Sequence, residues 1–268
     1  MTLNTEEISE APVKPAKAKR QPNAWNFAWI PGIFIKPRST LKKVIAAEKP
    51  VWLTPLLLIS VLVVISALVA APIRTQIAQA GNGEVPDGFQ WWSDADQAKY
   101  FESQNNKVGP MFMIVFPLLK GITGYWVLWF VFAAIWHLIL TLTGSRVARV
   151  KVSNVVAWAM LPLVLRVLVQ IINTLVTRTL GAPTGLSTWV AADATGFLSF
   201  IRFVLAGMDA YWLWFAILCL VAAAPLSQLK PAKAFWATLI CVVLVLILSA
   251  VPGLINSWLG KAAGNASF

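Results

Sequence analysis

Residues 51–71 read VWLTPLLLISVLVVISALVAA, a run in which no side chain carries a charge. An α-helix rises about 1.5 Å per residue, so about 20 residues cross the roughly 30 Å hydrocarbon core of a bilayer. Lys49 and Pro50 precede the run, and Pro72 and Arg74 follow it. The sequence therefore predicts a transmembrane helix over Val51–Ala71.

Further apolar blocks of similar length follow along the chain at Ile122–Leu142, Val155–Val176, Ala210–Leu226 and Phe235–Trp258. Together with the first, they predict an all-α fold, a polytopic bundle of five transmembrane helices. Two weaker apolar stretches, Met111–Leu119 and Phe197–Ala206, are too short to cross a bilayer alone. We expect each to form an interfacial or re-entrant helix, or to extend the neighbouring span.

The composition of the chain agrees with a membrane protein. Of its 268 residues, 58% are hydrophobic and only 12% are charged, whereas soluble domains carry about 25% charged residues. We expect a disordered polar tail over 1–24, a basic interfacial segment over 25–50, one membrane domain over 51–258 and a short C-terminal tail over 259–268. The polar tail lacks the apolar surface that would offset the entropy of ordering it.

Positive charge is distributed unevenly between the loops. Nine of the 22 Lys and Arg residues fall within the first fifty positions, and the short connections 143–154 and 227–234 add Arg146, Arg149, Lys151, Lys230 and Lys233. Because basic residues in short loops mark the cytoplasmic side, we predict a cytoplasmic N-terminus and an extracytoplasmic C-terminus. The same distribution accounts for the net charge of +11 and argues against nucleic acid as a partner.

The segment before the first span has an amphipathic pattern. Ser39 or Thr40 is suited to cap a short helix that places Leu41, Val44 and Ile45 on neighbouring faces. Basic residues surround this apolar stripe, namely Lys36, Arg38, Lys42, Lys43 and Lys49. One interpretation is a helix that lies on the cytoplasmic leaflet and binds anionic lipids. The other is ordinary basic sequence flanking a first span.

The residues that carry most enzyme chemistry are scarce. His137 is the only histidine, so a two-histidine metal motif cannot form. We expect His137 to form a hydrogen bond inside the bundle. Nucleophile motifs of the G-x-S-x-G type and phosphate-binding glycine loops do not occur. Cys219 and Cys241 both lie in apolar blocks, where we expect them to pack as small apolar side chains. The sequence predicts no enzyme, no metal and no cofactor.

Arg166 interrupts the third apolar block near its middle. A cation at that depth is costly unless it faces the bundle interior or a polar cavity and has a partner. Asp209, at the start of the fourth block, is the obvious acid, although its position along that block is shallower. Gln170 and Asn173 follow Arg166 on nearly the same helix face. These four residues form either a ligand, lipid or partner site, or a structural cation held inside the bundle.

Three groups of residues occur in a recognisable order along the chain. A basic Pro-containing segment, 36–45 (KPRSTLKKVI), leads into the first span through 50–55 (PVWLTP). Gly144 and Ser145 precede a basic linker and 158–162 (WAMLP), and 208–214 (MDAYWLW) opens the fourth span. In this order the motifs resemble those of the Yip domain family (Ypt/Rab-interacting protein type). The resemblance implies a five-span fold with a cytoplasmic N-terminal region.

The resemblance also implies a membrane adaptor or organiser rather than an enzyme. Eukaryotic members are implicated in vesicle traffic through prenylated GTPases, but this chain lacks an Asp-Leu-Tyr-Gly-Pro motif in its short basic N-terminal region. It is more similar to prokaryotic members, for which the cell membrane would be the location. We therefore expect a scaffold that binds other membrane proteins and anionic lipids on the cytoplasmic face, with homo-oligomerisation left open. The alternative is a small oligomeric transporter or channel for an anionic solute, lined by Arg166, Gln170 and Asn173.

Overall fold

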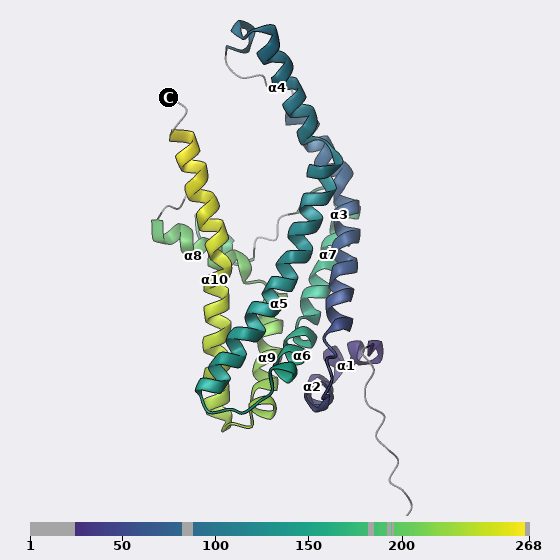
Figure 1. The fold of residues 1–268 in the computed structure, drawn as a ribbon, viewed down its shortest axis with the longest axis vertical. Coiled ribbons are helices and arrows are strands. Elements are labelled where there is room, and N and C mark those ends of the chain that lie inside the picture. The colour runs from purple at the N-terminus through teal and green to yellow at the C-terminus, as the bar shows by residue number, and fades with distance from the viewer. Residues whose placement is uncertain (1–24, 82–87, 182–184, 192–193, 195, 266–268) are drawn as a thin grey trace, which may run out of the picture.

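The computed structural model describes residues 25–81, 88–181, 185–191, 194 and 196–265. All regular elements in these ranges are helices (Figure 1). They are α1 (Ile30–Ile35), α2 (Pro37–Ala46), α3 (Leu53–Gly81), α4 (Asp94–Lys107), α5 (Phe116–Leu142), α6 (Arg149–Ala159), α7 (Leu161–Thr177), α8 (Gly196–Gly207), α9 (Ala210–Ser227) and α10 (Pro231–Asn265). The tail predicted for 1–24 lies outside the described residues.

Five helical segments are long and apolar enough to cross a membrane, which confirms the predicted number of spans. They are Leu53–Ala80, Met111–Leu142, Arg149–Thr177, Ala210–Ser227 and Pro231–Gly253. The protein is therefore a multi-pass integral membrane protein. Which end faces the cytoplasm stays a prediction from the charge distribution.

The boundaries of the second and fourth spans answer the question left open by the weaker apolar stretches. Met111–Val115 forms a π-helical turn that runs directly into α5, so this stretch extends the second span. Phe197–Ala206 instead lies in α8, a separate helix that contacts α10 and lies across it in Figure 1. The C-terminal end also differs from expectation, because α10 continues to Asn265 where a tail was predicted from 259.

The third span consists of two helices joined at Met160. Helix α6 ends at Ala159 and α7 begins at Leu161, with Pro162 in its first turn. Proline has no backbone N–H and is tolerated there because the first N–H groups of a helix have no partner within the helix. Pro162 therefore interrupts one crossing and marks the start of its second helix.

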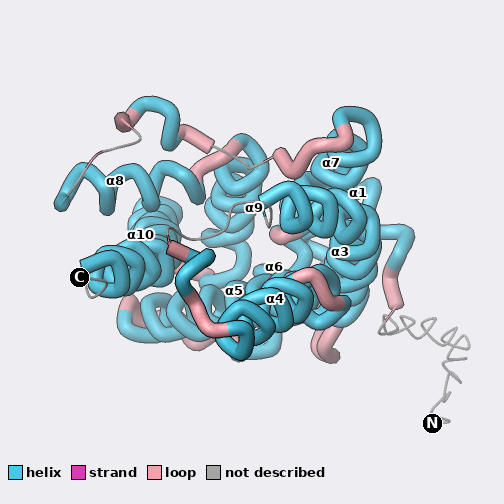
Figure 2. Tube along the Cα trace, turned by 90° about the horizontal axis from the view of Figure 1, so that it is seen from above, coloured by secondary structure: helices cyan, strands magenta, loops and turns pink. Residues whose placement is uncertain are grey.

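The helices are arranged as a bundle with two different ends. Helices α3, α5, α7, α9 and α10 lie side by side in Figures 1 and 2, and α1 and α2 cover one end. Helix α4 projects beyond the other end in Figure 1. The connections from α5 to α6 and from α9 to α10 lie at the same end as α2.

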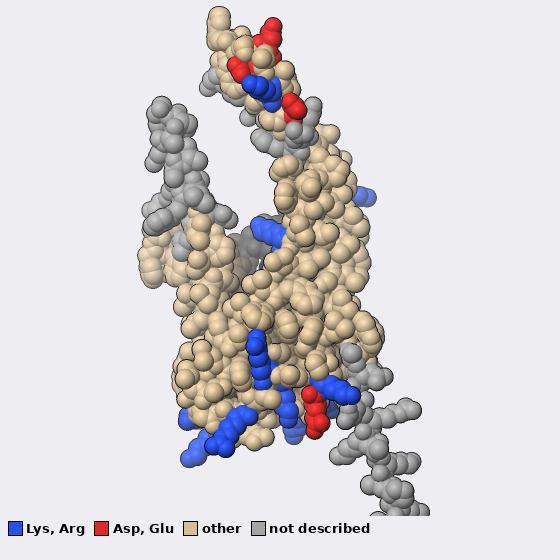
Figure 3. Space-filling view, viewed as in Figure 1, with Lys and Arg blue, Asp and Glu red and all other residues tan. Residues whose placement is uncertain are grey.

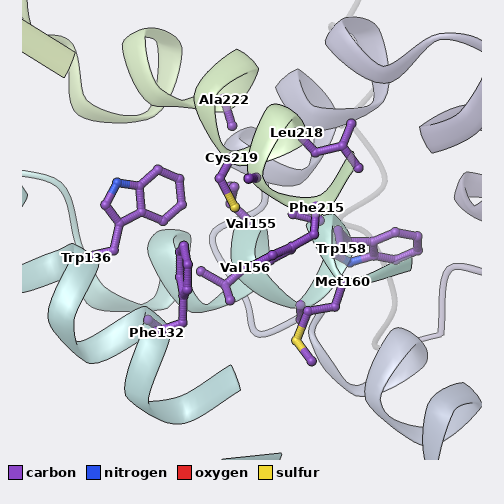
Figure 4. Packing of buried hydrophobic residues seen from close by; sticks show 14 of the residues in the cluster. Phe132, Trp136, Val155, Val156, Trp158, Met160, Phe215, Leu218, Cys219 and Ala222 are labelled. Atoms are coloured by element: carbon purple, nitrogen blue, oxygen red, sulfur yellow. The ribbon is translucent and has the colours of Figure 1, made fainter. Parts of the chain in front are cut away.

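The core lies between α5, α6 and α9 (Figure 4). Phe132 and Phe215 meet edge to face with ring centroids 4.9 Å apart, and Trp136 and Trp158 are fully buried beside them. Lipid is as apolar as these side chains, so close packing rather than hydrophobic burial must hold the helices together. Small buried residues such as Ala222 on α9 allow the backbones to approach each other.

Tryptophan side chains also connect the helices by hydrogen bonds. Four indole N–H groups donate to an acceptor on another segment: Trp126 to Ser60 Oγ (3.1 Å), Trp129 to the Ser153 carbonyl (3.0 Å), Trp136 to Thr238 Oγ1 (2.9 Å) and Trp158 to the Val51 carbonyl (3.0 Å). A polar group without a partner is costly in a bilayer, so these bonds favour one arrangement of the bundle. These tryptophans thus connect the helices as well as pack between them.

Candidate functional site

Helix α2 is fixed to the bundle by its apolar face. Leu41 and Val44 are fully buried, as is Ile33 of α1. Helix α2 contacts α6 and α9. The apolar stripe that one interpretation assigned to lipid is therefore covered by protein. The physical reason is that the ends of α6 and α9 offer an apolar surface for it.

The opposite face of α2 is basic and open. Lys36, Arg38, Lys42, Lys43 and Lys49 are all exposed, and so are four basic residues of the nearby connections and helix starts, Arg146, Arg149, Lys230 and Lys233. Figure 3 shows Lys and Arg gathered over this end, with little acid among them. We call the surface formed by these nine residues the basic end. It is a preformed cationic surface, because the helix that carries three of its members, Arg38, Lys42 and Lys43, is anchored in the core.

Two side chains of α6 secure the junction between α2 and α3. Asn154 is fully buried; its Oδ1 accepts from the Val51 N–H at 2.9 Å, and its Nδ2 donates to the Lys49 carbonyl at 3.0 Å. Trp158 donates to the Val51 carbonyl from one turn further along α6. Sequence reasoning missed Asn154. The only signal for it was an amide side chain directly before the apolar run of the third span.

The predicted partner of Arg166 is confirmed. Its Nε lies 2.9 Å from Asp209 Oδ2, and both side chains are largely buried. The contact is an ion pair, since the Nε–H does not meet the geometry of a hydrogen bond. The other carboxylate oxygen of Asp209 accepts from the Trp212 N–H at 2.8 Å and so caps α9. One carboxylate thus neutralises a cation and starts a helix.

The rest of the predicted polar stripe does not join this pair. Gln170 is half-buried and Asn173 is exposed on α7, whereas Arg166 faces a cavity that neither of them lines. The crossing runs from Arg149 to Thr177, which places Arg166 three residues past its midpoint, close to the predicted position.

The structure agrees with the prediction for the two cysteines and differs from it for His137. Cys219 and Cys241 are free and buried, as expected of small packed side chains. His137 differs from expectation: its Nδ1 is buried and has no hydrogen-bond partner within the described residues. Across the same part of the chain, no three metal-binding side chains come together.

The cavity beside Arg166 was not predicted from the sequence. It is open along much of its surface, has a volume of about 1070 Å³ and lies between α3, α5 and α7, with Arg74, Lys120 and Tyr125 in its wall. In the sequence, Arg74 follows the first apolar block and Lys120 precedes the second. Their proximity depends on how α3 packs against α5, which sequence spacing does not give.

The chain was also compared with known proteins. The sequence profile of the Yip1 domain matches residues 32–251, which is most of the chain. Searches of curated proteins and of solved structures gave no match. The matched region begins in α1 and ends in α10, so it includes the anchored basic helix and all five spans. The chain belongs to the Yip1 domain family.

Proposed function

We propose that this protein is a non-enzymatic membrane scaffold that holds other membrane proteins at its basic end. The observation that carries the proposal is the anchoring of α2. Its apolar face is buried against α6 and α9, while Lys36, Arg38, Lys42 and Lys43 stay exposed. A helix that only flanked the first span would need neither a buried apolar face nor the hydrogen bonds by which Asn154 holds the junction between α2 and α3.

The chemistry of the basic end selects for anionic partners. Each Lys or Arg close to an anionic surface contributes about 1 kcal/mol, and the attraction decays over roughly 8 Å at physiological ionic strength. On the predicted orientation, anionic lipids of the cytoplasmic leaflet surround this surface. Acidic juxtamembrane segments of neighbouring proteins are the partners that fit it, since they reach the same height above the bilayer.

The transporter alternative receives less support. It requires Arg166, Gln170 and Asn173 to line one path, but Asn173 lies on the exposed surface and only Arg166 lines the cavity. Arg166 is also paired with Asp209 at 2.9 Å, which lowers its attraction for a passing anion. We therefore propose the scaffold function and not the transporter or channel function.

The test compares partners retained by two forms of the full chain. Both are purified from native membranes into lipid nanodiscs, and the retained proteins are quantified by mass spectrometry. The first form is wild type, and the second carries Lys36→Gln, Arg38→Gln, Lys42→Gln and Lys43→Gln. The proposal predicts that wild type retains another membrane protein in a stoichiometric amount. The variant should retain at least tenfold less of that partner.

A matched control removes charge elsewhere. Lys99→Gln and Arg178→Asn neutralise two basic residues outside the basic end, and Asn tolerates the left-handed backbone of Arg178, whose φ is 54°. This control should retain the partner at the wild-type level. An equal loss in both variants, or no loss in either, would remove the basic end from the mechanism.

A further inference from the structure

The cavity between α3, α5 and α7 brings cations from three separate spans together. Arg74 comes from α3, Lys120 from α5 and Arg166 from α7. Asp209 compensates Arg166, but within the described residues neither Arg74 nor Lys120 takes part in an ion pair. The site therefore holds an excess of positive charge. Figure 3 shows basic atoms part way up the bundle, well separated from the basic end.

The guanidinium of Arg74 is held in place. Its Nη1 donates to the Met113 carbonyl at 3.1 Å. Met113 lies in the π-helical turn, and π-helical turns inside α-helices often occur at functional sites. Arg166 lies 2.9 Å from Asp209 through its Nε and also lines the cavity. Tyr125 adds a hydroxyl to the cavity wall.

The height of these cations matches a lipid headgroup. Arg74 lies 21 residues after the start of α3 at Leu53, and Lys120 lies 22 residues before the end of α5 at Leu142. At about 1.5 Å per residue, both lie about 30 Å above the basic end, which equals the thickness of the hydrocarbon core. Arg166, 17 residues after Arg149, lies about 5 Å deeper. The cations thus sit at and just below the phosphate level of the leaflet opposite the basic end.

The walls of the cavity are apolar away from the cations. Phe112 and Phe116 lie on the outer side of Lys120, where aromatic side chains favour the interface. Tyr125 and Leu128 continue the cavity about 12 Å inward from Lys120 along α5. A small hydrated anion would gain nothing from contact with this apolar wall, whereas an acyl chain would pack against it.

We propose that this cavity binds one anionic phospholipid from the leaflet opposite the basic end. Its phosphate would lie among Arg74, Lys120 and Arg166, and an acyl chain would follow α5 past Gly124 toward Leu128. The site is separate from the basic end and does not depend on the scaffold function. Lipid binding accounts for the excess positive charge, for the hydrogen bond that holds Arg74 and for the open space at Gly124.

Gly124 allows a steric test that leaves the charges untouched. It lines the cavity, and a Cβ built on it meets no atom within 4 Å. The backbone therefore has room for a side chain here, and Gly124→Phe should place its ring in the acyl path. Val127→Phe adds similar bulk to an exposed position of the same helix outside the cavity and serves as the control.

The experiment uses native mass spectrometry of the full chain released from nanodiscs. The discs contain equal amounts of phosphatidylglycerol and phosphatidylcholine with identical acyl chains. Wild type should retain one phosphatidylglycerol with at least a tenfold preference. Gly124→Phe should lower this retention at least tenfold because its ring occupies the acyl path. Arg74→Gln with Lys120→Gln should also lower it at least tenfold, because each basic residue contributes a factor of about five.

The controls separate this site from other sources of lipid binding. Val127→Phe, Arg178→Asn and the four-residue neutralisation of α2 should each retain the lipid within twofold of wild type. Loss on neutralising α2 would place the lipid at the basic end and overturn the proposal. Equal retention of both lipids, or retention unchanged in the cavity variants, would also overturn the proposal. Displacement of the lipid by millimolar glycerol phosphate would overturn it too, because it would indicate a site for free anions.

Discussion

The buried side chain of Asn154 accepts a hydrogen bond from the backbone N–H of Val51 at 2.9 Å, across 103 positions of sequence. Its amide group also donates to the carbonyl of Lys49. These residues form the turn at which the basic helix α2 passes into the first span. One buried amide therefore fixes the angle between the surface that we assign to partner binding and the membrane bundle.

Replacing Asn154 with alanine should destabilise the protein markedly. The change leaves the buried Val51 N–H without its acceptor, which costs about 1–3 kcal/mol, and also removes the bond to Lys49. For a chain of this size each kcal/mol corresponds to about 2–4 °C in Tm, so the loss at Val51 alone corresponds to a fall of about 2–12 °C. Scanning fluorimetry in mild detergent measures it. Asn173→Ala, at an exposed position on α7, should change Tm by less than about 1 °C.

The two roles of Asp209 can be separated by two substitutions. Asp209→Asn keeps an oxygen that can cap α9 at Trp212 but removes the negative charge beside Arg166. Asp209→Ala removes both. Losing one partner of a buried pair costs about 3–5 kcal/mol and losing a cap about 1 kcal/mol, so Ala should be worse than Asn by roughly the value of the cap.

The exposed pair on α4 provides the control for that comparison. Lys99 and Asp96 are 4.0 Å apart with most of their side chains in solvent. Asp96→Asn should therefore leave Tm almost unchanged. If Asp209→Asn proved as mild as Asp96→Asn, the Arg166 pair would have no structural role.

The packing of α3 against α5 depends on Gly121. A Cβ at this position would lie 2.6 Å from Cγ1 of Val63, and a β-branched side chain cannot easily turn away. Gly121→Ala should therefore lower Tm by several degrees, and adding Val63→Ala should recover most of the loss. Gly124→Ala, one turn further along with open space around it, should leave Tm equal or slightly raised. A Gly121→Ala protein as stable as Gly124→Ala would show that the helices are not in this close contact.

Orientation in the membrane can be tested by cysteine labelling. Cys219 and Cys241 are buried, so a membrane-impermeant maleimide should not react with them in the folded protein. On the predicted topology, Lys230→Cys should be labelled only after the cytoplasmic face is exposed, and Lys99→Cys should be labelled from outside intact cells. The reverse pattern would invert the topology and place the basic end outside.

The number of spans followed from the sequence because their apolar runs match the bilayer thickness. The break at Met160 was less visible, since Pro162 in an apolar run is compatible with a kink as well as with a new helix. The extension of α5 by Met111–Val115 was one of three outcomes that the pattern allowed. Apolar length alone cannot separate a helix that continues a span from one that lies across it, as α8 does.

The candidate sites were predictable only where one residue demanded a partner. Arg166 required an acid within reach, and Asp209 was the only one near membrane depth, so the pair could be inferred. Arg74 and Lys120 each fit the ordinary pattern of basic residues at span ends, so no local signal joined them to Arg166. The burial of α2 was equally hidden, because an amphipathic helix has the same pattern whether lipid or protein covers its apolar face.

The most direct test of the scaffold account is photo-crosslinking from the basic face of α2. A benzoylphenylalanine at the exposed Ser39 is to be compared with one at Val61, which is 54% exposed on the side of α3. The account predicts that Ser39 crosslinks a membrane protein other than this chain, that neutralising Lys42 and Lys43 weakens the crosslink, and that Val61 does not form it. Crosslinks from Ser39 only to lipid or to a second copy of the chain would contradict the account.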